Sequence, residues 1–138
     1  MVHAELSERI YSIIGAAMRV HSELKHGLLE SVYQESLAIE LGLRDIPHES
    51  EKLIRIYYRG IPLEKYYRAD IVCYDDIILE LKAVDKILPE HRAQLFNYLR
   101  LTKAKIGILM NFGDNSFKSE TYSYNQVTNQ CEIFYIKK

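Results

Sequence analysis

The sequence predicts an α/β fold whose core is a helix, a three-stranded antiparallel meander, a second helix and a further strand. Three observations lead to this prediction. Two helical patterns open the chain, a stretch rich in β-branched and aromatic residues follows, and an apolar helix then precedes a buried strand. The 138 residues are enough to bury an apolar core without disulfides. We therefore expect a single domain over residues 1–138.

Two helices are predicted before residue 45. Apolar residues recur at three- and four-residue steps from Leu6 to Leu24, which is typical of one helix face, and Gly27 is a suitable end for this helix. A second pattern runs from Leu29 to Leu41, with Gly42 where a C-terminal glycine is expected.

The middle of the chain has the composition of β-strands. Leu53 to Tyr58 and Leu63 to Tyr67 flank a turn at Arg59 to Pro62, which predicts a hairpin. Arg68 to Tyr74 and Ile77 to Ala83 are further strand-like segments, separated by two aspartates. Together they predict an antiparallel meander of three strands.

A helix and a buried strand follow the meander. Pro89 suits the first turn of a helix that runs to about Thr102, and the apolar run from Lys105 to Asn111 reads as a strand. A right-handed crossover would make this strand a parallel neighbour of the last meander strand. Lys118 to Tyr124 and Glu132 to Ile136 are expected to pair at a sheet edge.

Charge and terminal composition limit the choice of partner and location. The net charge of −1 means that any binding of nucleic acid must come from local patches. Cys73 and Cys131 lie far apart and match no zinc spacing, so reduced thiols are expected. The N-terminus carries acids where a signal peptide needs an apolar core, and no segment matches a membrane span. We expect a cytoplasmic protein.

Asp70, Glu80 and Lys82 are the residues best suited to chemistry. Glu80 and Lys82 are two apart in a strand and therefore share one face. Two nearby carboxylates repel each other unless a cation lies between them, and Mg²⁺ favours such oxygen ligands. Lys82 could orient or help deprotonate an attacking water and offset charge on phosphorus. The three residues predict a divalent-metal site that hydrolyses phosphodiester bonds.

This prediction places a condition on the loop between the two strands. A two-residue loop at Asp75 and Asp76 would put Asp70 opposite Leu81 and turn its carboxylate to the wrong face. The site therefore requires an odd-length loop or a bulge. Judged on spacing alone, a surface salt-bridge cluster is an equally good interpretation.

Two helices supply further candidates. Glu30 precedes Tyr33 by one helical turn and could reach the same cation, although an acid in a first turn also suits the helix dipole. Gln94 and Tyr98 are four apart and share a helix face, where the amide could hold a phosphate or a water bound to the metal. Alone, such a pair is more often surface decoration.

With these residues assembled, the sequence resembles the GxxExxY protein family, a branch of the PD-(D/E)xK nuclease superfamily. The resemblance rests on the Gly27 to Tyr33 segment, on Asp70 with Glu80 to Lys82, and on Gln94 with Tyr98, which is similar to the QxxxY motif of RecB-type nucleases. It implies a restriction-endonuclease-like core with an extra N-terminal helix and C-terminal edge strands. Ala69 stands where the motif has its proline.

The resemblance also implies roles for individual residues. Metal ligands, with Mg²⁺ or Mn²⁺ as the ion, would be Asp70, Glu80, the Leu81 carbonyl and Glu30. Lys82 would assist the nucleophilic water, and Gln94 would orient the substrate or Lys82. Substrate contacts would come from Tyr98 and Arg68, and Tyr33 would serve in packing.

Three functions remain in competition. The first is Mg²⁺-dependent hydrolysis of DNA or RNA. The second is a non-catalytic nucleic-acid-binding or assembly module, whose backbone contacts would come from Lys52, Arg55, Arg59, Lys65 and Arg68. The third is a protein-interaction domain, because the chain has eleven tyrosines. A homodimer would let so small a nuclease embrace two strands.

Overall fold

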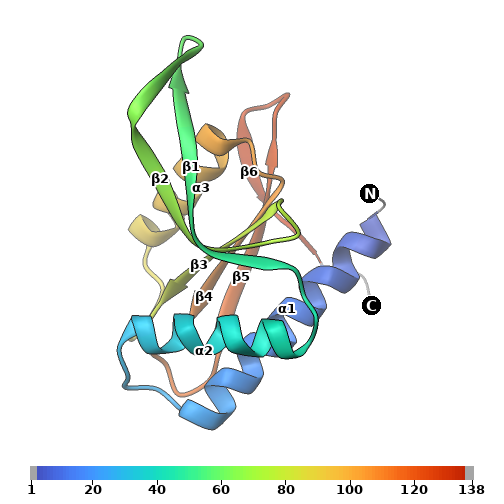
Figure 1. Cartoon of the computed structure of the whole chain (residues 1–138), viewed down its shortest axis with the longest axis vertical. Helices are drawn as coiled ribbons and strands as arrows, with labels where there is room; N and C mark the ends of the chain where they lie inside the picture. The colour runs from blue at the N-terminus through green and yellow to red at the C-terminus, as the bar shows by residue number, and fades with distance from the viewer. Residues whose placement is uncertain (1–2, 136–138) are drawn as a thin grey trace.

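The computed structural model describes residues 3–135 and contains one mixed six-stranded sheet with helices on both faces. The strands are ordered β1-β2-β3-β4-β5-β6, as in the sequence. In Figure 1 the helices α1 and α2 lie at one side of the sheet and α3 lies at the other. The expected order of helix, meander, helix and strand is confirmed.

The two N-terminal helices are present, but their ends differ from the prediction. Helix α1 spans His3–Leu24, and Lys25 ends it with a left-handed φ of 63° and an N–H bond to the His21 carbonyl. Gly27, with φ of 102°, lies in the following loop. Helix α2 spans Glu30–Leu43, so the prediction that Gly42 ends it was wrong. Backbone N–H groups of Arg44 and Asp45 bond the last carbonyls instead.

The meander consists of β1 (His48–Tyr58), β2 (Ile61–Cys73) and β3 (Ile77–Lys82), all antiparallel. The two segments predicted from residues 63 to 74 form one continuous strand, β2. Arg59 and Gly60 both have positive φ between the paired Tyr58 and Ile61, which is the two-residue turn that matches strand twist. The predicted count of three strands is confirmed.

The C-terminal half completes the sheet. Helix α3 spans Pro89–Thr102, and β4 (Ile106–Asn111) lies parallel to β3, as the crossover predicted. Strand β5 (Lys118–Asn125) pairs with both β4 and β6 (Gln130–Ile133), so of these two strands only β6 lies at the edge. The predicted strand end at Ile136 lies outside the described residues.

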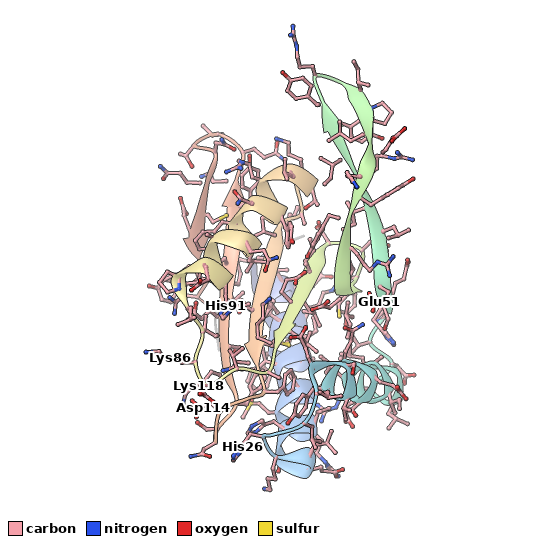
Figure 2. All side chains as sticks on the ribbon, turned by 90° about the vertical axis from the view of Figure 1, so that its left-hand side faces the viewer. His26, Glu51, Lys86, His91, Asp114 and Lys118 are labelled. Carbon is pink, nitrogen blue, oxygen red and sulfur yellow. The ribbon has the colours of Figure 1, made fainter. Side chains whose placement is uncertain are left out.

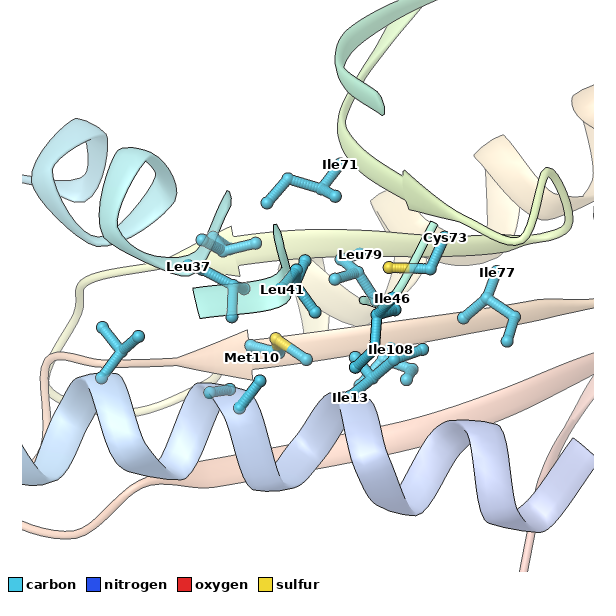
Figure 3. Close-up of a cluster of buried hydrophobic side chains, with 14 of the residues drawn as sticks. Ile13, Leu37, Leu41, Ile46, Ile71, Cys73, Ile77, Leu79, Ile108 and Met110 are labelled. Carbon is cyan, nitrogen blue, oxygen red and sulfur yellow. The ribbon is translucent and has the colours of Figure 1, made fainter. Parts of the chain in front are cut away.

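The central strands separate two apolar cores. Leu79 and Leu81 of β3 pack with α1 and α2, whereas Ile78 packs with α3. Figure 3 shows the first core, where Ile13 and Leu37 approach the strands from two different helices. Because side chains alternate along a strand, Glu80 and Lys82 belong to the face that carries α3.

The ends of β3 and β4 are fastened to each other. The Asn111 side chain is fully buried, and its Nδ2 donates to the Val84 carbonyl at 2.9 Å. Its Oδ1 accepts the N–H groups of Val84 and Gly113, both at 3.0 Å. A Cβ atom at Gly113 would lie 2.3 Å from the Val84 nitrogen and 2.6 Å from the Ala83 carbonyl carbon. Only glycine fits here, and the contact fixes the chain directly after the Glu80 to Lys82 segment.

We predict that Gly113→Ala destabilises the protein by about 1–3 kcal/mol, because backbone atoms of Val84 cannot move aside as a side chain can. Gly42→Ala is the matched control. Its Cβ would meet nothing closer than 3.8 Å, and alanine is favoured over glycine within a helix. Urea unfolding of both variants measures the difference. Equal stabilities would show that the β3 and β4 ends are loosely held.

Candidate active site

The loop between β2 and β3 has the odd length that the site requires. Tyr74, Asp75 and Asp76 form a three-residue turn, and the first two adopt φ of 54° and 62°. Cys73 therefore pairs with Ile77, and continuing this register brings Asp70 level with Glu80. The two carboxylates are thereby carried on neighbouring strands at the same height.

Asp70 lies where β2 and β3 separate. Their pairing ends at Ile71 and Leu79, and beyond it the Asp70 Oδ2 accepts the Leu81 N–H at 2.8 Å. Ala69 packs in the core beneath α3, whereas Ile71 packs in the core of α1 and α2. Regular alternation would place residues 69 and 71 on one face, so β2 changes faces at Asp70. The site occupies this fork in the sheet.

Glu80 is the most buried carboxylate of the site. The residue is 7% exposed, and its Oε1 is buried with no hydrogen-bond partner among residues 3–135. Burial raises the pKa of Glu80 to about 8, and the charge of Glu30 adds to the rise. The charge of Lys82 and the Asp70 backbone N–H oppose it without cancelling it. Glu80 therefore lacks a counter-charge sufficient to keep it ionised.

The other two carboxylates are perturbed in the same direction. Desolvation first, and then the charge of Glu51, raise the pKa of Asp70, against the Leu81 N–H and Lys82. Desolvation and the charge of Asp70 raise the pKa of Glu30, which begins α2. The three acids thus interact electrostatically, and a cation placed among them would stabilise the ionised form of each.

The donor set fits a hard divalent ion. Among residues 3–135, no group of three His, Cys, Asp or Glu side chains is arranged to hold a metal ion by itself. Mg²⁺ usually takes only one or two carboxylates, with water and substrate phosphate as its other ligands. Asp70 and Glu80 meet that smaller requirement, and the unpartnered Glu80 Oε1 is an oxygen that lacks a donor.

Lys82 is held by side chains of α3. Its Nζ donates to the Gln94 Oε1 at 3.3 Å, and the Gln94 Nε2 donates to the Tyr98 hydroxyl at 2.8 Å. Tyr98 in turn stacks on Tyr67 of β2 with ring centroids 3.7 Å apart. The i,i+4 pair predicted from the sequence therefore forms one chain of contacts with Lys82.

Tyr33 explains the spacing of the Gly27 to Tyr33 segment. Its hydroxyl donates to the Lys25 carbonyl and accepts the Leu28 N–H, which closes the loop between α1 and α2. Its ring is fully buried and stacks on Phe112 at 4.9 Å. Tyr33 thus fixes where α2 begins, and the first residue of α2 is Glu30.

Sequence reasoning missed two neighbours of Asp70. Gln34 of α2 donates from Nε2 to the Asp70 carbonyl at 3.3 Å, and its position four residues after Glu30 was a usable signal. Glu51 has a left-handed φ of 54° within β1 and acts electrostatically on Asp70. Figure 2 shows Glu51 at the base of the long hairpin, beside α2. No sequence signal marks this conformation for a glutamate.

A mixed sheet flanked by helices, with carboxylates and a lysine where two strands diverge, defines an α/β fold of the restriction-endonuclease type. The model of the PD-(D/E)XK nuclease superfamily matches residues 7–124. The chain belongs to this superfamily. The predicted fold class is confirmed, and superfamily members act on nucleic acid.

A solved structure described as "Crystal structure of SSO0001" is similar to this chain with a TM-score of 0.53 and 22% sequence identity. The similarity covers 88% of this chain and 65% of that one, so this chain spans less than two thirds of its length. At that identity the likeness concerns the fold. No curated protein matches the chain. Within residues 3–135, the helices are too short or too polar to span a membrane.

We predict that Glu80→Gln stabilises the metal-free protein at alkaline pH. The folded pKa of Glu80 is about 8 against an ordinary 4.5, so its favourable contribution is complete below pH 4.5 and is lost as the pH rises to 8. Glutamine does not ionise, and at pH 8.5 the variant should gain on the order of 2 kcal/mol. Denaturant unfolding at pH 5 and 8.5, in chelator, measures this gain.

Glu49→Gln, which replaces an exposed acid on β1, is the control and should follow the wild-type protein at both pH values. If the Glu80→Gln curve also runs parallel to the wild type, Glu80 ionises without cost and the electrostatic account of the site is wrong.

Proposed function

We propose that this protein is a metal-dependent nuclease that hydrolyses phosphodiester bonds of DNA or RNA. The observation that carries the proposal is the buried Glu80 carboxylate, which lies level with Asp70 and has an oxygen without a partner among the described residues. A purely structural cluster would leave such an oxygen paired or exposed. Perturbed acids in one place are typical of functional sites.

In this proposal Asp70, Glu80, the Leu81 carbonyl and Glu30 hold Mg²⁺ or Mn²⁺. The ion would polarise a phosphate oxygen and lower the pKa of a bound water. Asp70 already has one oxygen fixed by the Leu81 N–H, which leaves its other oxygen to face the ion. The raised pKa values of the three acids support a site completed by positive charge.

Lys82, Gln94, Tyr98 and Arg68 would act on the water and the substrate. The Gln94 oxygen restricts the Lys82 ammonium group, which would orient the attacking water and offset negative charge on phosphorus. Tyr98 supports Gln94 from the next helical turn. Arg68 is exposed on β2, two residues before Asp70, and would contact a phosphate beside the scissile bond.

We assign the chain within the superfamily to the GxxExxY branch. The contacts of Tyr33 support this assignment, because they give the tyrosine of that motif a structural role. They set the start of α2 and hence the position of Glu30. A cytoplasmic location and assembly as a homodimer stay predictions.

We predict that the protein cleaves nucleic acid in Mg²⁺ or Mn²⁺ and loses cleavage in EDTA. Lys82→Ala and Asp70→Asn should each lower the single-turnover rate by about 100-fold or more. Asparagine keeps an oxygen to accept the Leu81 N–H, so that variant should retain its fold. Lys105→Ala, which changes an exposed lysine before β4, should cleave as the wild type does.

Labelled single-stranded, duplex and branched substrates, supplied to an excess of protein, measure this activity. If all of them stay intact while DNA still binds in a salt-sensitive way, the protein is a non-catalytic binding module.

Metal binding can be tested without any substrate. Titration calorimetry with Mn²⁺ should give one site in the wild type, and its affinity should fall at least tenfold in Glu80→Gln. Mn²⁺ should also raise the melting temperature of the wild type more than that of the variant, because only the folded state brings Asp70 and Glu80 together. Equal affinities in both proteins would place the ion elsewhere.

A further inference from the structure

The β1–β2 hairpin reaches far beyond the rest of the sheet. Strand β2 pairs with β3 only from Ile71 to Cys73, so residues 52–69 pair only with each other. We call these residues the arm. Figures 1 and 2 show it extending past the other strands as an isolated two-stranded ribbon. The outer part of this ribbon adds little to the core, and its length calls for another explanation.

The two faces of the arm differ in composition. On one face Ile54, Ile56 and Tyr67 are buried or half-buried against the core beneath α3. The opposite face is exposed and carries two arginines among apolar and aromatic residues: Leu53, Arg55, Tyr57, Tyr66 and Arg68. Large exposed apolar groups interleaved with cations indicate a binding surface.

Charge on the arm is segregated from the rest of the chain. Residues 52–69 contain five cationic side chains, Lys52, Arg55, Arg59, Lys65 and Arg68, but only one acid, Glu64. The arm thus has a net charge of +4, although the whole chain has −1. Such a segment attracts a polyanion even though the remaining surface is acidic.

Part of the exposed face is held in place before any partner arrives. The Arg55 guanidinium donates to the Leu63 carbonyl at 2.6 Å and to the Tyr66 hydroxyl at 2.7 Å, and it lies 4.4 Å from the Tyr66 ring centre. These contacts span the irregular pairing after Arg55 and stiffen the ribbon there. An ordered surface loses less entropy on binding than a mobile one.

The exposed face leads directly to the candidate active site. Arg68 is exposed on β2 two residues before Asp70, where the strand changes faces, so a ligand lying along the arm would reach the edge of the site. From Asp70 to the turn at Gly60 the strand covers about 30 Å at roughly 3.3 Å per residue. This is close to one turn of B-DNA, which is about 34 Å.

We propose that the arm lies in the major groove of duplex DNA and guides one of its phosphodiester bonds to Asp70. A two-stranded ribbon fits the major groove of B-DNA, which is about 12 Å wide, whereas the deep, narrow groove of duplex RNA excludes it. The inference rests on the proposed nuclease function for its cleavage step, and its binding step is independent of that function.

The test compares Arg59→Glu/Lys65→Glu with Arg19→Glu/Arg44→Glu. The first pair reverses two charges on the arm. The second makes the same change on α1 and at the C-terminal end of α2, where each arginine pairs with an exposed or partly exposed glutamate. Fluorescence anisotropy with a 20-base-pair duplex in EDTA measures binding without cleavage, and thermal unfolding confirms that both variants fold.

We expect the arm variant to bind DNA at least tenfold more weakly than the control, with a salt dependence of log Kd reduced by about 2. Duplex RNA of the same sequence should bind at least tenfold more weakly than DNA to the wild type. Equal binding by arm and control variants, or equal binding of RNA and DNA, overturns the proposal.

Two further outcomes separate DNA binding by the arm from dimerisation through the arm and from the proposed nuclease function. If light scattering shows that the arm variant converts a dimer into monomers, a second copy occupies the arm and the proposal is wrong. If arm-dependent DNA binding is present but no metal supports cleavage, the nuclease function fails while the arm assignment holds.

Discussion

Burial of the Glu80 carboxylate sets the electrostatics of the whole site. β3 lies inside the sheet between β2 and β4, with helices on both faces, so a charge on this strand is removed from water. The three-residue turn after Cys73 then places Asp70 beside it, and α2 brings Glu30. Each added acid makes ionisation of Glu80 harder, while the single cation Lys82 offsets only part of the effect. The arrangement persists because the surrounding packing fixes the strands and helices that carry these side chains.

That packing comes from positions remote from the chemistry in sequence. The Asn111 amide and the close approach of Gly113 to Val84 secure the chain just beyond Lys82. The Tyr33 hydroxyl secures the start of α2, and the stacking of Tyr98 on Tyr67 joins α3 to β2. The groups that would act on substrate are thus supported from four elements, which is how a site is kept within the small tolerances that catalysis demands.

The sequence was sufficient for the order of elements, because side-chain periodicity is local. It also indicated the loop parity that aligning Asp70 with Glu80 requires, but only the structure shows the three-residue turn that meets this condition. It failed where tertiary contacts override local preference. Gly42 resembles a helix end, yet α2 continues past it. Glu51 adopts a left-handed conformation that its residue type disfavours. The predicted segments divide β2 between Tyr67 and Arg68, although no turn residue lies there and the strand runs unbroken from Ile61 to Cys73. The roles of Asp70, Glu80 and Lys82 remain predictions.

The bond from the Leu81 N–H to Asp70 means that two acids of one site differ in what their removal costs the fold. The Asp70 carboxylate takes the place of a missing strand partner, so losing its oxygen would leave the Leu81 N–H without an acceptor. Glu80 serves no such purpose and opposes folding at neutral pH. In a homologue that lacked the proposed activity, replacing Glu80 would carry no such cost, whereas replacing Asp70 would lose this hydrogen bond. Glu80 is therefore the better marker of whether the proposed activity is retained.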